Sequence, residues 1–279
     1  MNVLEASYAY CEGVARREAK NFYYSFLLLR RDQRRAMCAI YAFMRYCDDL
    51  SDAEGIEYRG DAMTRWRRQL EIALQDRIPD HPVWAAFVDT VRRYQIPHKY
   101  FLDMIDGVSS DLQPRRIVTF EELYEYCYRV ASVVGLTIIH IFGFHQREAL
   151  KLAEKCGIAF QLTNILRDVR EDAVNQRVYL PEEDLGRFGV PPEDLLKAQV
   201  TRRLRELLKF EAERARAYFT ESAPLVGMID ARSRSSLKAL IGSYSALLDR
   251  IVASNYEVLR KRIRVPAAQK IWILVRSRF

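Results

Sequence analysis

Residues that interrupt regular secondary structure are scarce in this chain, with 11 glycines and 9 prolines among 279 residues. No stretch is low in complexity, and neither a linker nor a repeat of solenoid length divides the sequence. Strand-like alternation is also rare, whereas a helical period dominates four long segments: 122–144, 147–172, 202–219 and 232–262. Hydrophobic residues make up 49% of the chain, enough for a large core. The sequence predicts one all-α domain over residues 1–279.

Long hydrophobic runs are missing too. The longest, residues 133–144, contains Thr137 and His140 and is too short to span a bilayer. Four charged residues stand where a signal peptide would be apolar, namely Glu5, Glu12, Arg16 and Arg17. The five cysteines are scattered, odd in number and without the spacing of metal ligands, which predicts reduced, buried thiols. We therefore expect a cytoplasmic protein.

Acidic residues are fewer than basic residues, and the formal net charge is +7. Bases concentrate in residues 202–216 and 260–278. In the first segment acids alternate with them at helical spacing, a pattern typical of a solvated, ion-paired face, so nucleic acid is not an expected partner. Residues 270–279 are basic and aromatic. They suit either peripheral contact with an anionic membrane on its inner face or a short helix packed on the domain.

The most informative residues form two polar stripes. The first has spacings of 4, 3 and 4, and its members are Tyr41, Arg45, Asp48 and Asp52. The second has spacings of 3, 4 and 4, and its members are Gln161, Asn164, Asp168 and Asp172. These intervals place each set on one face of an α-helix. Because both segments are otherwise apolar, and unpaired buried carboxylates are strongly disfavoured, the stripes predict a cation between them.

Chance and a surface role compete with a cation site as explanations of the stripes. A chain of this length carries about one D-x-x-x-D by chance. Asp76 and Asp80 form such a pair, but Pro79 lies within it and no polar stripe precedes it, which predicts a loop. If the stripes are merely a solvated face, their acids belong to i,i+4 ion pairs, namely Arg45 with Asp49 and Arg167 with Glu171.

The ligand types favour magnesium over zinc. Mg²⁺ prefers oxygen ligands and commonly combines one or two carboxylates with substrate phosphates, while both stripes lack Cys and His. Tyr41, Arg45 and Arg167 lie close enough in sequence to the acids to bind phosphate oxygens. No glycine-rich phosphate loop follows a strand, so nucleotide chemistry is not expected. These features indicate a metal-bound diphosphate in a helical cavity.

Departure of diphosphate would leave a carbocation, which aromatic rings can stabilise through their π faces. The chain has 16 Tyr and 13 Phe, although each taken singly is more often an ordinary core residue. One segment combines two tyrosines with small residues that could leave room for an isoprenoid tail. Its members are Tyr126, Tyr128, Val130, Ala131, Val134 and Gly135.

Five collinear blocks resemble the squalene/phytoene synthases, which join two prenyl diphosphates head to head. The blocks are Lys20–Phe26, Ala39–Asp52, Tyr126–Gly135, Gln161–Pro181 and Tyr244–Tyr256. The Gln161–Pro181 block is the most specific. The resemblance implies the class I terpenoid (isoprenoid) synthase fold, which is all-helical with a central cavity.

Site roles follow from the same resemblance. It implies that two or three Mg²⁺ are bound by Asp48, Asp52, Asn164, Asp168 and Asp172. It implies substrate contacts from Lys20, Asn21, Tyr41, Arg45, Gln161, Arg167, Arg177 and Tyr244. Participation in catalysis is implied for Asp48, Asp52, Asp168, Asp172, Tyr126 and Tyr244.

Two positions depart from the family pattern. Glu18–Asn21 stands where the family carries a diphosphate-binding flap, often rich in serine. Lys20 and Asn21 can donate to phosphate there, whereas an ionised Glu18 cannot. Lys261 stands where many members have arginine, whose planar fork binds anions in a bidentate way that lysine cannot match.

Within the family, the overall likeness favours condensation of two farnesyl diphosphates to presqualene diphosphate. The alternative is a phytoene synthase that condenses two geranylgeranyl diphosphates. NADPH is not an expected cofactor, because no dinucleotide fold or G-x-G-x-x-G is present. Outside the family, a class I terpene cyclase and a basic helical binding module compete with this interpretation. The sequence leaves the oligomeric state open.

Overall fold

The computed structural model describes residues 2–19, 22–52 and 56–278. Its first helices are α1 (Val3–Glu18), α2 (Phe22–Phe26), α3 (Arg31–Asp52), α4 (Ile56–Ala73), α5 (Trp84–Arg93), α6 (His98–Ser109), the short η1 (Ser110–Leu112), α7 (Phe120–Cys127) and the π-helical η2 (Tyr128–Ser132). They are followed by α8 (Val133–Phe142), α9 (Glu148–Val174), α10 (Glu182–Phe188), the short η3 (Pro192–Leu196), α11 (Arg202–Ser222), α12 (Leu225–Met228), α13 (Arg234–Ala253) and α14 (Ala267–Arg276). Two-residue strands, β1 (Arg115–Arg116) and β2 (Arg177–Val178), pair in parallel. The all-α prediction is confirmed.

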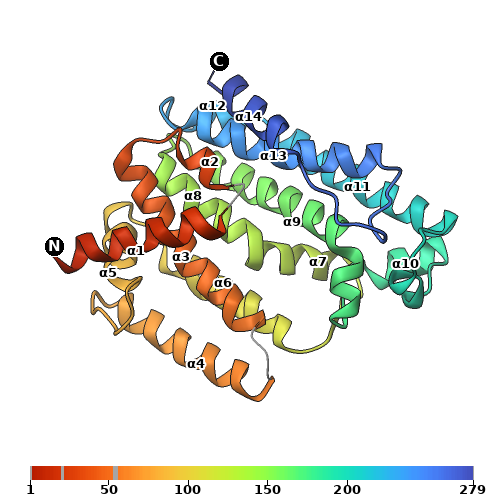
Figure 1. The fold of residues 1–279 in the computed structure, drawn as a ribbon, viewed down its shortest axis with the longest axis horizontal. Helices are drawn as coiled ribbons and strands as arrows, with labels where there is room; N and C mark the ends of the chain where they lie inside the picture. Colours follow the sequence, from red (N-terminus) through yellow and green to blue (C-terminus); the bar gives the residue numbers. More distant parts are fainter. Residues whose placement is uncertain (1, 20–21, 53–55, 279) are drawn as a thin grey trace.

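Helix α9 runs through the middle of the molecule, with other helices on all sides (Figure 1). Its N-terminal half packs into one apolar cluster with α1, α3, α5, α6 and α8. Five of its later side chains, Ile158, Leu162, Ile165, Leu166 and Val169, belong to a second cluster with α7, α10, α11 and α13, while Phe160 still packs against the first. A helix that is apolar on several sides is stable only when buried. The polar stripe on α9 is therefore held by a helix that takes part in both cores.

Helix α3 is fixed by an aromatic cluster beneath it. The Phe43 ring lies 4.6 Å from Phe87 and 5.9 Å from Trp66, centroid to centroid, and Trp66 lies 4.4 Å from Trp84. All four side chains are buried. Phe43 lies two residues after Tyr41, about 200° around the helix, so anchoring one face of α3 directs the polar stripe the other way.

The π-helical turn η2 is wedged between α6 and α9 at two glycines. A Cβ added to Gly157 would lie 2.5 Å from the Cα of Ser132, and one added to Gly107 would lie 2.8 Å from the Cβ of Arg129. Both distances are shorter than side chains tolerate, so only glycine permits this approach. Two glycines inside helices thus set the position of η2.

Gly157→Ala is expected to destabilise the protein by about 1–3 kcal/mol, because its methyl group meets backbone atoms that cannot easily move. Gly186→Ala on α10 is the matched control, since nothing lies within 4 Å of its added Cβ. That control should gain about 0.5–1 kcal/mol from helix propensity. Urea unfolding of both variants is the measurement, and equal stabilities would contradict the close approach.

Two features differ from the periodicity. Segment 122–144 is divided by η2, and segment 232–262 ends as a helix at Ala253. The second break occurs because Asn255 and Tyr256 adopt positive φ angles of 55° and 61°, which a right-handed helix cannot contain. The D-x-x-x-D at Asp76 is a loop, as predicted, and Asp76 itself has a φ of 58°.

All five cysteines are buried and unpaired, as the sequence predicted. None of the helices in the described part of the chain has the length and apolar character needed to cross a membrane.

Candidate active site

Both polar stripes line one cavity of about 580 Å³. Along α3 its lining changes from apolar Met37 and Ile40 to polar Arg45 and Asp48. Along α9 it changes in the same sense, from Ala153–Phe160 to the acids near the C-terminus. The partial negative charge at a helix C-terminus adds to these carboxylates. The cavity thus combines an apolar body with a polar region that favours cations.

Every predicted site residue whose side chain is described lines this cavity. These residues are Tyr41, Arg45, Asp48, Tyr126, Gln161, Asn164, Arg167, Asp168, Asp172, Arg177 and Tyr244. Lys20 and Asn21 lie outside the described residues. Asp52 is the last residue of α3, and its side chain also lies outside them. Lining the cavity is an observation, whereas the catalytic, substrate and metal roles given to all of these residues remain predictions.

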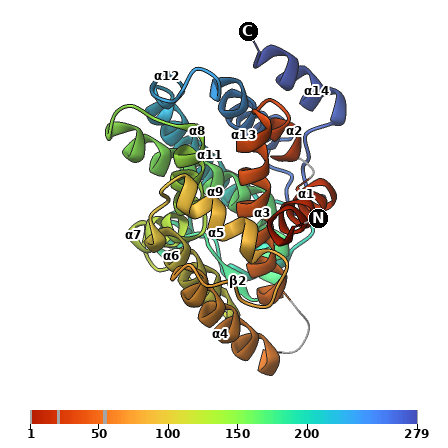
Figure 2. The same cartoon turned by 90° about the vertical axis from the view of Figure 1, so that its left-hand side faces the viewer.

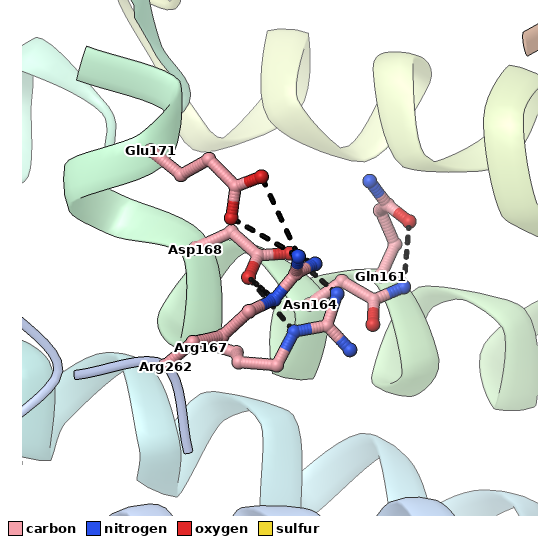
Figure 3. A network of polar contacts seen from close by, with 6 residues as sticks. All are labelled: Gln161, Asn164, Arg167, Asp168, Glu171 and Arg262. Atoms are coloured by element: carbon pink, nitrogen blue, oxygen red, sulfur yellow. Dashed lines mark hydrogen bonds and ion pairs between the residues drawn. The ribbon is translucent and has the colours of Figure 1, made fainter. Parts of the chain in front are cut away.

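Two arginines hold Asp168 from either side (Figure 3). Nε of Arg167 donates to Oδ1 of Asp168 at 2.8 Å, and a second Arg167 nitrogen donates to Oδ2. Nε of Arg262 lies 2.9 Å from Oδ1, while its Nη1 lies 3.2 Å from Oε2 of Glu171. Of the two pairs that the solvated-face hypothesis predicts, the one between Arg167 and Glu171 is not among the ion pairs of the described residues. Arg167 pairs with the carboxylate predicted to bind metal, and Glu171 pairs with Arg262.

Two polar groups on α9 would be stabilised by a bound cation. Nδ2 of Asn164 donates to Oε1 of Gln161 at 3.3 Å, but Oδ1 of Asn164 is buried and has no hydrogen-bond partner in the described structure. Burial, followed by the negative charges of Asp168 and Glu171, raises the pKa of Asp172 to about 7. A divalent cation would satisfy the amide oxygen and favour the ionised carboxylate.

Acidic side chains alone do not complete a cation site in this cavity. Within the described ranges, no three His, Cys, Asp or Glu residues converge as a metal cage. The available oxygen ligands are Asp48, Asn164, Asp168 and Asp172, all of which line the cavity. Mg²⁺ usually completes its octahedron with water and substrate phosphate, so this donor set fits it, whereas zinc would prefer nitrogen or sulfur.

Arg45 combines two environments. Its Nη2 lies 2.5 Å from Oδ1 of Asp49, which is the i,i+4 pair that the solvated-face hypothesis predicts. Its Nε is nevertheless buried without a hydrogen-bond partner in the described structure, and the side chain lines the cavity. Arg45 therefore retains donor capacity for an anion in the cavity.

Arg45→Lys is expected to raise the KM for prenyl diphosphate about tenfold, because lysine keeps the charge but loses the planar fork. Steady-state kinetics would measure it. Asp49→Asn is the control, since it removes the exposed partner at a cost below about 1 kcal/mol and leaves the guanidinium in place. An unchanged KM in Arg45→Lys would restrict Arg45 to its pair with Asp49.

Asp111 is a site residue that the sequence did not indicate. It lines the cavity from η1 and accepts hydrogen bonds from the hydroxyls of Tyr126 at 2.9 Å and Tyr179 at 2.8 Å. The two tyrosine rings stack at 4.7 Å. Burial raises the pKa of Asp111, which the two hydroxyl donors oppose. Asp111 lies outside both stripes, so their helical spacing gave no signal for it.

Arg262 was also missed. The sequence comparison pointed to Lys261 as the residue standing for a family arginine, but Lys261 is exposed and does not line the cavity. Its neighbour Arg262 lines the cavity and reaches Asp168. In a run of four bases within five residues, sequence alone could not say which one turns inward.

The apolar body of the cavity matches the predicted tail-binding segment in part. Tyr126, Val130, Ala131, Val134 and Gly135 line the cavity, as the sequence predicted, whereas Tyr128 does not. The π-helical turn shifts the register at Tyr128–Ser132, which a regular 3.6-residue period does not anticipate.

An aromatic pair lies between the polar and apolar regions. Tyr244 of α13 stacks on Phe160 at 4.0 Å with an interplanar angle of 10°, and Phe22 of α2 lies 5.8 Å from Tyr244. Burial raises the pKa of Tyr244, so its hydroxyl stays protonated. These faces are suited to a cation formed beside departing diphosphate.

Comparison with known proteins decides the family. A model of the family described as squalene/phytoene synthase matches residues 15–269. The chain belongs to the squalene/phytoene synthase family. Squalene/phytoene synthases are prenyltransferases that condense two prenyl diphosphates head to head, and they use divalent metal to bind diphosphate. The hypothesis of a basic helical binding module is thereby overturned.

Individual relatives agree with this membership. The chain is 39% identical over 277 residues to the chloroplastic phytoene synthase of Daucus carota, covering 97% of this chain and 69% of the relative. It is 36% identical over 285 residues to the 15-cis-phytoene synthase of Synechococcus elongatus, covering 96% and 91%.

Solved structures share the architecture. A dehydrosqualene synthase crystal structure superposes with a TM-score of 0.92 and 30% identity, covering 99% of this chain and 96% of that one. A squalene synthase from Alicyclobacillus acidocaldarius gives 0.82 and 27%, covering 91% and 99%. The predicted isoprenoid synthase fold is confirmed.

Proposed function

We propose that the protein is a magnesium-dependent phytoene synthase that condenses two geranylgeranyl diphosphates. The observation that carries this proposal is identity of 36–39% to phytoene synthases over at least 96% of the chain. It supports the twenty-carbon substrate over the farnesyl substrate that the sequence first favoured. The similarity in fold to dehydrosqualene and squalene synthases leaves the fifteen-carbon substrate as the outcome to test against.

In this proposal Asp48, Asn164, Asp168 and Asp172, with Asp52, hold Mg²⁺. Bound there, Mg²⁺ supplies the positive charge that neutralises the departing diphosphate. The oxygen ligands come from two separate helices, so they would hold the metal from α3 and from α9 while substrate phosphates complete its coordination. Their C-terminal positions on α3 and α9 keep this charge away from the apolar body of the cavity.

Arginine side chains would bind the diphosphate, and aromatic side chains would stabilise the carbocation. Arg45 and Arg167 donate to diphosphate oxygens as the allylic C1–O bond breaks. The faces of Tyr244 and Phe160 stabilise the allylic cation, which the double bond of the second substrate attacks at C1. Loss of a proton closes the cyclopropane of prephytoene diphosphate. A second ionisation, rearrangement and proton loss give phytoene, and the apolar walls exclude the water that would quench either cation.

The test is product analysis with geranylgeranyl and farnesyl diphosphates supplied separately and together, with Mg²⁺ and with or without NADPH. We expect phytoene from the twenty-carbon substrate and no dependence on NADPH. Presqualene diphosphate from farnesyl diphosphate, with the longer substrate unused, would instead support the fifteen-carbon reading. Squalene formed with rapid oxidation of NADPH would contradict both.

A further inference from the structure

Helix α14 exposes an unusual set of large apolar side chains. The exposed fractions are 60% for Ile271, 60% for Trp272 and 48% for Val275, and none of the residues of α14 is buried. At 100° per residue these three share one side of the helix. Ile273 points the opposite way, where its Cγ2 packs 3.1 Å from the Cβ position of Gly242 on α13. Helix α14 thus packs on α13 with one side and exposes an apolar strip, Ile271, Trp272 and Val275, on the other.

The excess of basic over acidic residues in the chain comes from residues 260–278. Residues 260–278 contain seven Lys and Arg and no acid, and the rest of the chain has 37 basic and 37 acidic residues. One of the seven, Arg262, pairs inward with Asp168. Arg276 and Arg278 are exposed and flank the bare side of α14. The segment that carries the excess of seven basic residues therefore also carries the exposed apolar strip of Ile271, Trp272 and Val275.

A basic pocket lies near the start of α14, where Arg250 of its lining reaches Gln269. Its volume is about 400 Å³, and its lining includes Arg250, Lys261, Arg262 and Arg264 but no acid. Arg250 fixes the pocket, because its Nε donates to the carbonyl of Arg264 at 3.0 Å. Burial and the positive charge of Arg264 lower the pKa of Lys270, so positive charges lie close together in this part of the chain. Such a pocket is suited to a phosphate group.

The position of α14 connects it with the cavity. Both views place α14 and α2 beside α13, at the opposite end of the molecule from α4 (Figures 1 and 2). Leu240 and Tyr244 of α13 line the cavity, as does Phe22 of α2, while Tyr24 and Leu27 at α2 are exposed at 48% and 45%. Helix α14 therefore packs on the outer side of α13, whose inner side lines the cavity.

We propose that α14 and residues 260–266 form a docking surface for an anionic lipid bilayer. Ile271, Trp272 and Val275 enter the boundary between headgroups and acyl chains, and the bases bind lipid phosphates. A second copy of this chain fits poorly, because like charges would meet across the interface. Nucleic acid would use the bases but leave the apolar strip in water. The inference does not depend on which prenyl diphosphate is the substrate.

The chain carries its own reporter. Trp66 and Trp84 are buried, at 3% and 0% exposure, so Trp272 is the tryptophan that a neutral quencher such as acrylamide reaches. Vesicles of phosphatidylcholine with phosphatidylglycerol should blue-shift the emission and protect it from acrylamide at low salt. Pure phosphatidylcholine vesicles should do neither. Trp272→Phe should abolish the response, which assigns it to this residue.

Flotation with the same vesicles measures binding in variants. Ile271→Ser with Trp272→Ser should weaken partition by roughly tenfold or more, through lost apolar burial. Arg276→Gln with Arg278→Gln should weaken it roughly tenfold on anionic vesicles, and salt should weaken the wild type likewise. Matched controls on α4 are Tyr58→Ser and the pair Arg65→Gln with Arg68→Gln, all at exposed sites. Controls should bind like the wild type.

Each contrary result overturns the proposal. The first is that the wild type and both α14 variants bind vesicles equally. The second is that Trp272 is protected from acrylamide without lipid, in a dimer that forms as protein concentration rises. The third is that nucleic acid, in the absence of vesicles, binds the protein through the same residues. Because Ile271 and Trp272 are exposed, circular dichroism should show both α14 variants folded. No substrate enters these assays, so their failure leaves the proposed synthase activity untouched.

Discussion

Asp168→Asn is expected to lower turnover about 10²- to 10³-fold at saturating Mg²⁺ and prenyl diphosphate, with helix content unchanged. The substitution keeps the shape but removes the charge that a cation shared with diphosphate requires. In the metal-free protein Asp168 is also the shared partner of Arg167 and Arg262, so the variant should lose about 1 kcal/mol of stability. Single-turnover kinetics and urea unfolding measure the two effects.

Glu171→Gln is the matched control for Asp168→Asn. Glu171 lies on the same helix and pairs with the same Arg262, but it does not line the cavity. Its loss should change turnover less than about twofold, as expected for an exposed ion pair. Equal losses in the two variants, or wild-type turnover in Asp168→Asn, would refute the metal-binding role.

Asp172→Asn is expected to have opposite effects on activity and stability. Turnover should fall as in Asp168→Asn, while the metal-free protein becomes more stable above pH 7. The pKa of Asp172 is raised from 3.8 to about 7, so the folded state binds more protons than the unfolded state between these values. Stability therefore falls as pH rises from about 4 to 7 and is lowest above it. Asparagine removes a penalty of the order of 2–4 kcal/mol.

Thermal unfolding at pH 5 and pH 8, in EDTA and in Mg²⁺ with pyrophosphate, tests this prediction. In EDTA the variant should gain most on the wild type at pH 8 and gain less at pH 5, where the folded carboxyl is protonated but the unfolded one is already largely ionised. With Mg²⁺ and pyrophosphate the wild type should be stabilised and the variant should not. A variant that is less stable at pH 8 in EDTA would show that Asp172 is paired in the metal-free protein.

The sequence located the acids well, because helical spacing is a local property. Four-residue intervals on α3 and α9 predicted which side chains share a face, and those with described side chains do line one cavity. Family resemblance added Tyr126 and Tyr244, which lie on other elements and have no spacing relation to the acids. These positions require knowledge of which helices pack together.

What escaped the sequence depends on backbone features without a periodic signal. The π-helical turn at Tyr128–Ser132 exists because Gly107 and Gly157 let three helices approach closely, and it displaced Tyr128 from the predicted lining. Positive φ angles at Asn255 and Tyr256 ended α13 early and placed Arg262, rather than Lys261, beside Asp168. Asp111 entered the site through a short turn, η1, that periodicity cannot detect.

Because every cysteine is buried, we expect the native chain to react only slowly with thiol reagents. Burial raises the pKa of Cys11, Cys38 and Cys156 to about 12, so at neutral pH only about one such thiol in 10⁵ is ionised. The pKa of Cys47 and of Cys127 is raised as well. A cysteine introduced at Tyr58, which is 75% exposed on α4, would be the one fast-reacting thiol. A spin label there could follow α4 without removal of any native cysteine.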